Sequence, residues 1–278
     1  MFSNKIFFAA VASAFVLNTS AWAQTSTTPD ATTTYTPKVG QAGKDVVWVP
    51  TAQALVDRML DMAQLMPEDR LVDLGSGDGI TVITAAKRGA TAHGIEYNPK
   101  MVELSRQNAK AEGVSDRATF EQADIFKSDF SNATVITLFL LPELNLRLRP
   151  TLLEMKPGTR VVSNTFTMGD WQPDQTEQVS SVEGCSNYCD AYKWIIPAKV
   201  AGTWKMADKE LELTQTFQML EGSLHEGNTT LPISNARLDG TQIQFSVGDD
   251  HYSGVVNGNE MRGTINNKTA WSATFSKR

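Results

Sequence analysis

A glycine-rich segment holds the residues whose types and spacing point most directly to chemistry. Residues 71–80 have the sequence Leu-Val-Asp-Leu-Gly-Ser-Gly-Asp-Gly-Ile, with Gly75, Gly77 and Gly79 at alternate positions. Glycines after an apolar run let the backbone turn tightly and approach a ligand closely before a helix begins. Glu96 ends the next apolar segment, where an acidic side chain can receive ribose hydroxyls. The pattern predicts a nucleotide-type cofactor site at the carboxyl edge of a parallel sheet.

The spacing of the glycines separates two classes of cofactor. A dinucleotide site has the pattern G-x-G-x-x-G, whereas Ile80 stands here where the third glycine belongs. Asp73 and Asp78 place carboxylates around the loop, which suits a cationic ligand and suits a pyrophosphate poorly. The alternative is that both aspartates only cap the turn or the helix. We therefore favour a cationic cofactor that contains adenosine over a nicotinamide dinucleotide.

In these motifs the chain resembles class I S-adenosylmethionine-dependent methyltransferases, and in particular small seven-strand enzymes such as the ATP synthase c-subunit lysine methyltransferases. The resemblance covers residues 47–171 and rests on several ordered segments. These are Trp48-Val49-Pro50-Thr51, Val72 to Gly79, Gly94-Ile95-Glu96-Tyr97-Asn98-Pro99, Ala123-Asp124-Ile125-Phe126 and Arg160-Val161-Val162-Ser163. The resemblance implies a methyltransferase that uses S-adenosyl-L-methionine.

The resemblance also implies a role for each residue of the cofactor site. Asp73 and the glycine loop are expected to hold the methionine part, and Glu96 the ribose hydroxyls. Asp124 is expected to meet the adenine amino group, with Tyr97 or Ile125 against the ring. The predicted cofactor-binding residues are Asp73, Gly75, Ser76, Gly77, Gly79, Glu96, Tyr97, Asp124 and Ile125.

The segment that ends the fourth expected strand is where acceptors bind in such enzymes. Residues 138–145 have the sequence Leu-Phe-Leu-Leu-Pro-Glu-Leu-Asn and lack the Asn/Asp-Pro-Pro-aromatic run of many enzymes that methylate nucleic-acid bases. This departure disfavours a base or glutamine acceptor and leaves a lysine, another protein group or a small molecule. The predicted catalytic residues are Glu143, to orient or deprotonate an amine, and Asn145, to hydrogen-bond it. Alternatively, Glu143 simply starts a helix, since acids favour first turns.

The elements that must position these residues alternate between strands and helices. Strands are expected at residues 71–74, 91–96, from 119, 133–141, 159–165, 177–182 and 192–196, and helices at 80–88 and 99–112. This alternation predicts an α/β fold with a doubly wound, mostly parallel, Rossmann-like seven-strand sheet.

The remainder of the chain divides into segments of different character. Short alternating strands after residue 199, with turn signals between them, predict a small antiparallel all-β barrel or sandwich. The predicted organisation is a signal peptide at 1–23, a Thr-rich flexible linker at 24–44, a methyltransferase domain at 45–198 and an antiparallel β domain at 199–278.

The N-terminal residues bear on the compartment. Residues 1–23 contain Lys5, an apolar stretch at 6–17 and Ala-Trp-Ala before Gln24, which is the form of a secretory signal peptide. The apolar stretch is shorter than the about 20 residues of a membrane helix, although an uncleaved anchor is the competing interpretation. We expect an exported, periplasmic protein without a transmembrane span after cleavage.

The two cysteines and the net charge further restrict the kinds of ligand and partner that we expect. Cys185 and Cys189 are the two cysteines, and in an oxidising compartment their spacing permits a disulfide. Two free thiols are the alternative, and no metal site is expected because a zinc site needs further ligands. A formal net charge of −6 gives no support for nucleic-acid binding, which favours a basic surface.

Two functional hypotheses follow from these observations. The first is an exported methyltransferase whose acceptor is a protein group, with lysine as the leading choice, or a small molecule. The second is a catalytically inactive cofactor-binding or envelope-interaction protein. The second hypothesis is supported by the chemistry of S-adenosyl-L-methionine, which is permanently charged and does not cross a membrane unaided to reach an exported protein.

Overall fold

The computed structural model describes residues 1–2 and 35–277. The predicted signal peptide, apart from residues 1–2, and residues 24–34 of the predicted linker lie outside the described residues. Within the described part, no helix has the length and apolar character needed to span a membrane.

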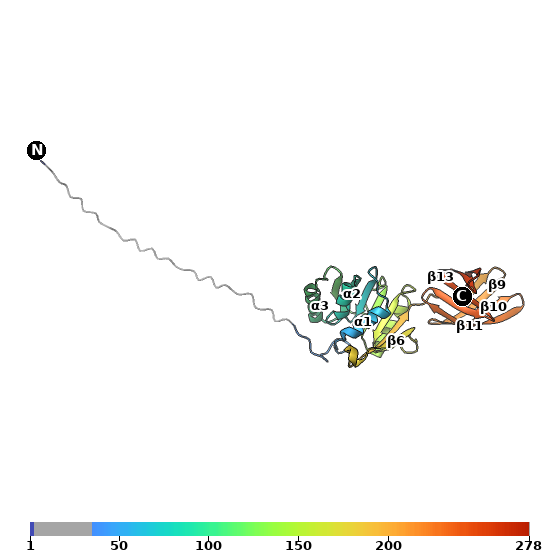
Figure 1. Cartoon of the computed structure of the whole chain (residues 1–278), viewed down its shortest axis with the longest axis horizontal. Coiled ribbons are helices and arrows are strands. Elements are labelled where there is room, and N and C mark those ends of the chain that lie inside the picture. The colour runs from blue at the N-terminus through green and yellow to red at the C-terminus, as the bar shows by residue number, and fades with distance from the viewer. Residues whose placement is uncertain (3–34, 278) are drawn as a thin grey trace. The chain divides into compact units, whose positions relative to one another are not determined.

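A seven-stranded sheet forms the first part of the fold, as predicted (Figure 1). Its strands are β1 (Arg70–Leu74), β2 (Thr91–Glu96), β3 (Ala118–Gln122), β4 (Val135–Leu138), β5 (Arg160–Asn164), β6 (Gln175–Gln178) and β7 (Asp190–Ile195). Their order in the sheet is β3-β2-β1-β4-β5-β7-β6. The first five strands are parallel, and β7 runs antiparallel to both β5 and β6. The carboxyl ends of β1 to β5 therefore meet at one edge.

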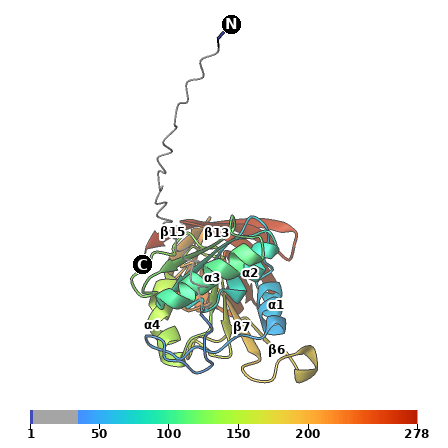
Figure 2. The same cartoon turned by 90° about the vertical axis from the view of Figure 1, so that its left-hand side faces the viewer.

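Helices cover both faces of this sheet because its central strands bury alternate side chains on opposite sides. The helices are α1 (Gln53–Met62), α2 (Ile80–Lys87), α3 (Pro99–Ala111) and α4 (Pro142–Leu153). Leu71 of β1 packs in one cluster with α1, α2 and α3, whereas Val72 and Leu74 pack in another with α4. Figure 2 shows α2 and α3 side by side on the face to which Leu71 contributes.

Several helix and strand ends follow from local sequence. Asn98 caps α3, since its side chain accepts a hydrogen bond from the Lys100 amide at 3.0 Å and Pro99 takes the first helical position. The predicted fourth strand, at 133–141, is shorter in the structure and ends at Leu138. Residues 139–141 instead line a pocket before Pro142 starts α4.

The C-terminal part is a closed eight-stranded antiparallel barrel (Figure 1). Its strands are β8 (Gly202–Met206), β9 (Lys209–Thr216), β10 (Met219–Glu226), β11 (Thr229–Asp239), β12 (Gln242–Val247), β13 (Asp250–Asn257), β14 (Glu260–Ile265) and β15 (Thr269–Lys277). Trp204, Phe245 and Trp271 fill its interior and are each less than a tenth exposed. The barrel alternative of the sequence prediction is therefore confirmed.

Buried polar and aromatic contacts join the barrel to the segment between β5 and β6. The Trp171 indole donates a hydrogen bond to the Gln218 side chain at 2.9 Å and stacks on Phe217 with ring centroids 5.6 Å apart. Arg237 pairs with Asp174 at 3.0 Å. Because Trp171 is fully buried by these contacts and those of the sheet, the barrel contributes to the packing of the methyltransferase part.

Candidate active site

The glycine loop joins β1 to α2 at the carboxyl edge of the sheet. Gly75, Gly77 and Gly79 have φ of +86°, +54° and +85°, which is left-handed backbone that residues with a Cβ rarely adopt. At Gly77 a Cβ would lie 2.8 Å from the Trp48 indole nitrogen, so glycine is also required sterically. The loop is therefore shaped for close approach of a ligand.

Helix α3 and strand β2 hold the loop from behind. The Gly75 and Ser76 amides both donate to the Ile95 carbonyl, at 2.8 and 3.1 Å. The Ser105 hydroxyl donates to the Gly77 carbonyl at 2.8 Å, and the Asn108 side chain donates to the Asp78 carbonyl at 3.0 Å. These bonds fix the loop before any ligand arrives, which lowers the entropic cost of binding.

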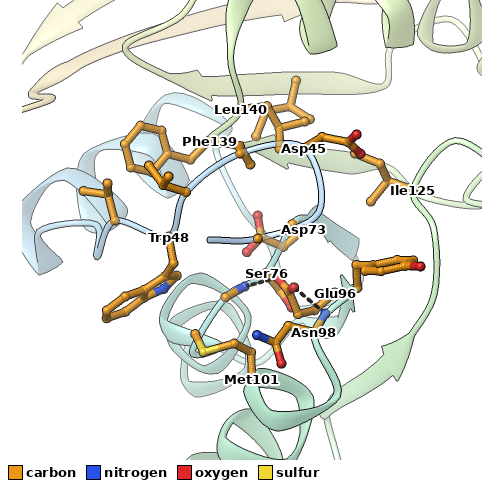
Figure 3. A pocket seen from close by; sticks show the side chains of 18 of the residues that line it. Asp45, Trp48, Asp73, Ser76, Glu96, Asn98, Met101, Ile125, Phe139 and Leu140 are labelled. Carbon is orange, nitrogen blue, oxygen red and sulfur yellow. Dashed lines mark hydrogen bonds between the residues drawn. The ribbon is translucent and has the colours of Figure 1, made fainter. Parts of the chain in front are cut away.

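Two carboxylates face the loop from the ends of β1 and β2 (Figure 3). Asp73 is 7% exposed and accepts a hydrogen bond of 2.6 Å from the Thr137 hydroxyl. Burial raises the pKa of Asp73 to about 7, against the opposing effect of the Thr137 bond, and the charge of Glu96 adds to the rise. Glu96 accepts hydrogen bonds from the amides of Gly77 at 3.0 Å and Asn98 at 2.8 Å.

The polar groups of this pocket fit S-adenosyl-L-methionine. A buried carboxylate with a raised pKa gains most from a cationic partner, and the ammonium of a methionine moiety supplies one. Glu96 keeps free lone pairs beside its two amide bonds, so it can accept from ribose hydroxyls. The buried Ser76 hydroxyl has no hydrogen-bond partner within the described part of the chain, and its oxygen would lie 2.5 Å from a Cβ at Gly94, so this side chain packs against β2.

The residues predicted to surround the adenine also line this pocket. Tyr97 and Ile125 lie at the same edge, and the Tyr97 side chain is 50% exposed. Asp124 is paired with Lys44 at 2.8 Å, and the hydrogen bond from that ammonium lowers the pKa of Asp124. The Lys44 ammonium also stands 5.0 Å from the Tyr97 ring centroid.

The segment 41–48 crosses the pocket, although residues 41–44 belong to the predicted linker. A bridge between Ala42 and Val47 closes it into a turn, and Trp48 lies against the glycine loop (Figure 3). The Gln41 side chain approaches the Met101 sulfur at 3.5 Å. Polar composition gave no signal for this packing, because the turn is held by backbone hydrogen bonds and by single side chains.

Three predicted site residues lie outside the pocket lining. Gly79 turns the chain into α2, and a Cβ there would lie 2.8 Å from the Phe120 ring. Glu143 is exposed in the first turn of α4. Asn145 is fully buried, and its amide donates to the Phe166 and Thr167 carbonyls at 3.1 and 3.2 Å. These contacts give Asn145 a structural task, namely to hold the turn after β5.

The other half of the pocket contains residues that were not singled out from the sequence, although Phe139 lies in the segment 138–145 predicted to bind the acceptor. Phe139 follows β4, Asn164 ends β5, Phe166 follows it, and Tyr188 precedes β7. Tyr188 lies between Cys185 and Cys189, which form the predicted disulfide. Asn164 could have been predicted as a site residue, because it is a polar residue at the carboxyl end of an expected strand.

Comparisons with known proteins show the class to which this chain belongs. The sequence profile of the ANTKMT methyltransferase domain matches residues 73–175. A protein-lysine N-methyltransferase of Saccharolobus islandicus (strain REY15A) is 42% identical over 137 residues, which is 48% of this chain and 85% of that protein. The ATP synthase c-subunit lysine N-methyltransferase of Homo sapiens is 38% identical over 128 residues, and the chain spans 54% of its length.

A solved structure gives the same result for the fold. The crystal structure of an RNA methyltransferase from Salinibacter ruber in complex with S-adenosyl-L-homocysteine is 48% identical, with a TM-score of 0.51 over 55% of this chain and 96% of that one. Fold and site thus define a class I S-adenosylmethionine-dependent methyltransferase. Within that class, the chain belongs to the family described as the ANTKMT methyltransferase domain.

Proposed function

We propose that this protein is an exported enzyme that transfers the methyl group of S-adenosyl-L-methionine to the side-chain amine of a protein lysine. The observation that carries the acceptor is the 42% identity to a protein-lysine N-methyltransferase across 85% of that relative. The uncharged, largely apolar lining contributed by β4, β5 and the loop before β7 supports it, since a lysine has a long apolar stem.

The reaction needs alignment more than it needs covalent help from the protein. The cofactor supplies the methyl group on a cationic sulfonium, and orientation of acceptor and donor can contribute about 7 to 11 kcal/mol. Asp73 and Glu96 fix the donor end, whereas the apolar half of the pocket favours the neutral amine, the form that can attack. No charged residue of the described lining follows β4 or β5.

Export is supported by two separate features. Residues 1–23 have the composition of a signal peptide. The Cys185–Cys189 disulfide is of the kind that persists in oxidising compartments. Fractionation of cells that make the full chain, followed by N-terminal sequencing, tests this part: we expect the protein outside the cytoplasm, beginning at Gln24. A cytoplasmic protein that retains residues 1–23 contradicts it.

Methyl transfer is tested with tritiated cofactor, the purified protein and an extract of envelope proteins. We expect labelled protein whose label is recovered as methyl-lysine after hydrolysis, and loss of labelling in Asp73→Ala and Glu96→Ala. Lys38→Ala, at an exposed position outside the pocket lining, is the matched control. Label on another amino acid, or none with bound cofactor, refutes the lysine proposal.

An RNA acceptor is the second candidate because the Salinibacter ruber relative is described as an RNA methyltransferase. The net charge of −6 weighs against it, since RNA binding rests largely on basic side chains that contact phosphates. Adding total RNA to the labelling reaction separates the two, because nuclease-sensitive label appears only with an RNA acceptor.

A further inference from the structure

The pocket is built from two sets of strands with different chemistry. Its acidic residues come from β1 and the loop after it, from β2, from the segment after β3 and from the crossing segment 41–48. The segments that follow β4 and β5 and precede β7 contribute an uncharged half with three aromatic rings. The first half matches the cofactor, so the second half is left to receive the acceptor.

The three rings stand close enough to form a single wall. Ring centroids are 6.3 Å apart for Phe139 and Phe166, 5.5 Å for Phe139 and Tyr188, and 6.2 Å for Phe166 and Tyr188. Tyr188 is 46% exposed, so the wall reaches from the pocket to solvent. Aromatic faces attract alkylammonium groups and pack against their methylene stems.

Asn164 supplies a polar atom in this apolar half. It is 1% exposed, and its amide nitrogen donates to the Thr51 hydroxyl at 3.4 Å. Its Oδ1 atom is buried and has no hydrogen-bond partner among residues 35–277. A buried acceptor left unpaired is costly, so a ligand N–H that reaches it gains a well-placed partner.

We propose that Phe139, Phe166 and Tyr188 bind the stem of a primary alkylamine, and that Asn164 Oδ1 accepts a hydrogen bond from its nitrogen. The inference rests on the proposed function and assigns its acceptor site. The bound ammonium first releases a proton to solvent, and the neutral nitrogen then uses its lone pair to form the new N–C bond as the S–C bond breaks. The positive charge passes from sulfur to the nitrogen of the product, which remains a methylammonium.

The placement of Tyr188 ties this site to the disulfide. Its backbone has a φ of +56° within the five-residue loop closed by Cys185 and Cys189, and the Cys189 carbonyl accepts from the Val179 amide at 2.9 Å. The loop thus holds the outer ring of the wall. Tyr188 touches the acceptor in this proposal but has no part in binding the cofactor.

Binding of a small probe tests the site independently of turnover. The full chain, saturated with S-adenosyl-L-homocysteine, is titrated with Nα-acetyl-lysine N-methylamide and, separately, with the norleucine analogue, which has an uncharged side chain. We expect NMR shifts for the lysine probe, binding about tenfold weaker in Tyr188→Ala, and near-normal binding in Tyr188→Phe. Asn164→Leu should also weaken it, while Val182→Ala, 95% exposed and outside the lining, should not.

The readouts separate the inference from the proposed function. With a lysine peptide, Tyr188→Ala should raise KM with little change in kcat, and Asn164→Leu should lower kcat, both with normal cofactor affinity. Equal binding of the two probes, or unchanged binding in Tyr188→Ala, overturns the inference. Probe binding without methyl transfer to any lysine overturns the proposed function alone. Free n-butylamine as a better acceptor than the peptide assigns the site to small amines.

Discussion

Replacement of Asp73 by asparagine should stabilise the protein above pH 7 while it weakens cofactor binding. The pKa of Asp73 is about 7 in the folded chain against an ordinary value of 3.8. A carboxyl with a raised folded pKa carries no penalty below pH 3.8, costs increasing stability as the pH rises, and carries its full penalty above 7. At 1.36 kcal/mol for each pKa unit, that penalty reaches about 4 kcal/mol.

The quantity to measure is the difference in free energy of unfolding between Asp73→Asn and the wild type, compared at two pH values. An asparagine can still accept the 2.6 Å bond from Thr137, but its buried amide N–H groups lose water, which costs about 1 to 3 kcal/mol at any pH. Comparison of pH 5 with pH 8 cancels that cost. The stability advantage of Asp73→Asn should therefore grow by about 2 to 3 kcal/mol between pH 5 and pH 8.

Urea denaturation followed by circular dichroism at the two pH values measures this growth, and calorimetry with S-adenosyl-L-homocysteine measures the affinity. We expect a cofactor affinity lower by about tenfold to a hundredfold, because a charged partner is lost. Asp124→Asn is the control, since the pKa of Asp124 is lowered and its loss should bring no such growth. A stability advantage of Asp73→Asn that is equal at pH 5 and pH 8 refutes the raised pKa of the buried Asp73.

Three further outcomes follow from the same geometry. In the wild type, cofactor affinity should rise about tenfold per pH unit up to pH 7 and then level off, as binding requires the ionised Asp73; calorimetry across this range checks it. Glu96→Gln should weaken cofactor binding by about tenfold or more in the same assay, because one acceptor of charge-assisted bonds becomes a donor. Replacing both Cys185 and Cys189 by serine should raise the acceptor KM while the cofactor affinity stays unchanged, measured by initial rates and calorimetry.

The cofactor half of the site was accessible from sequence because its chemistry is local. The turn after β1 needs glycine at positive φ, and Glu96 follows the next strand directly, so short-range spacing predicts both. The barrel was predictable for a similar reason, since its hairpins carry turn residues such as Asp239-Gly240 and Asn257-Gly258. Neither inference depends on contacts between distant residues.

The acceptor half depends on such contacts and could not be predicted in the same way. Glu143 and Asn145 were predicted as catalytic because they lie close to β4 in sequence. The helix that begins at Pro142 instead exposes Glu143 to solvent and buries Asn145 in the core. The wall unites Phe139 with Tyr188, which lies in a different part of the chain. Lys44 reaches Asp124 across 80 positions, and linker composition carries no signal for this pair.

The division of the pocket has an evolutionary consequence. The residues assigned to the cofactor are encoded mainly before β4, and those assigned to the acceptor after it, so the two proposed specificities lie on separate stretches of the gene. Substitution in the later stretch can change what is methylated while the methyl source is kept. Relatives described as acting on lysine and on RNA can share such a donor half, and natural diversification in this family should concentrate around residues 139, 164, 166 and 188.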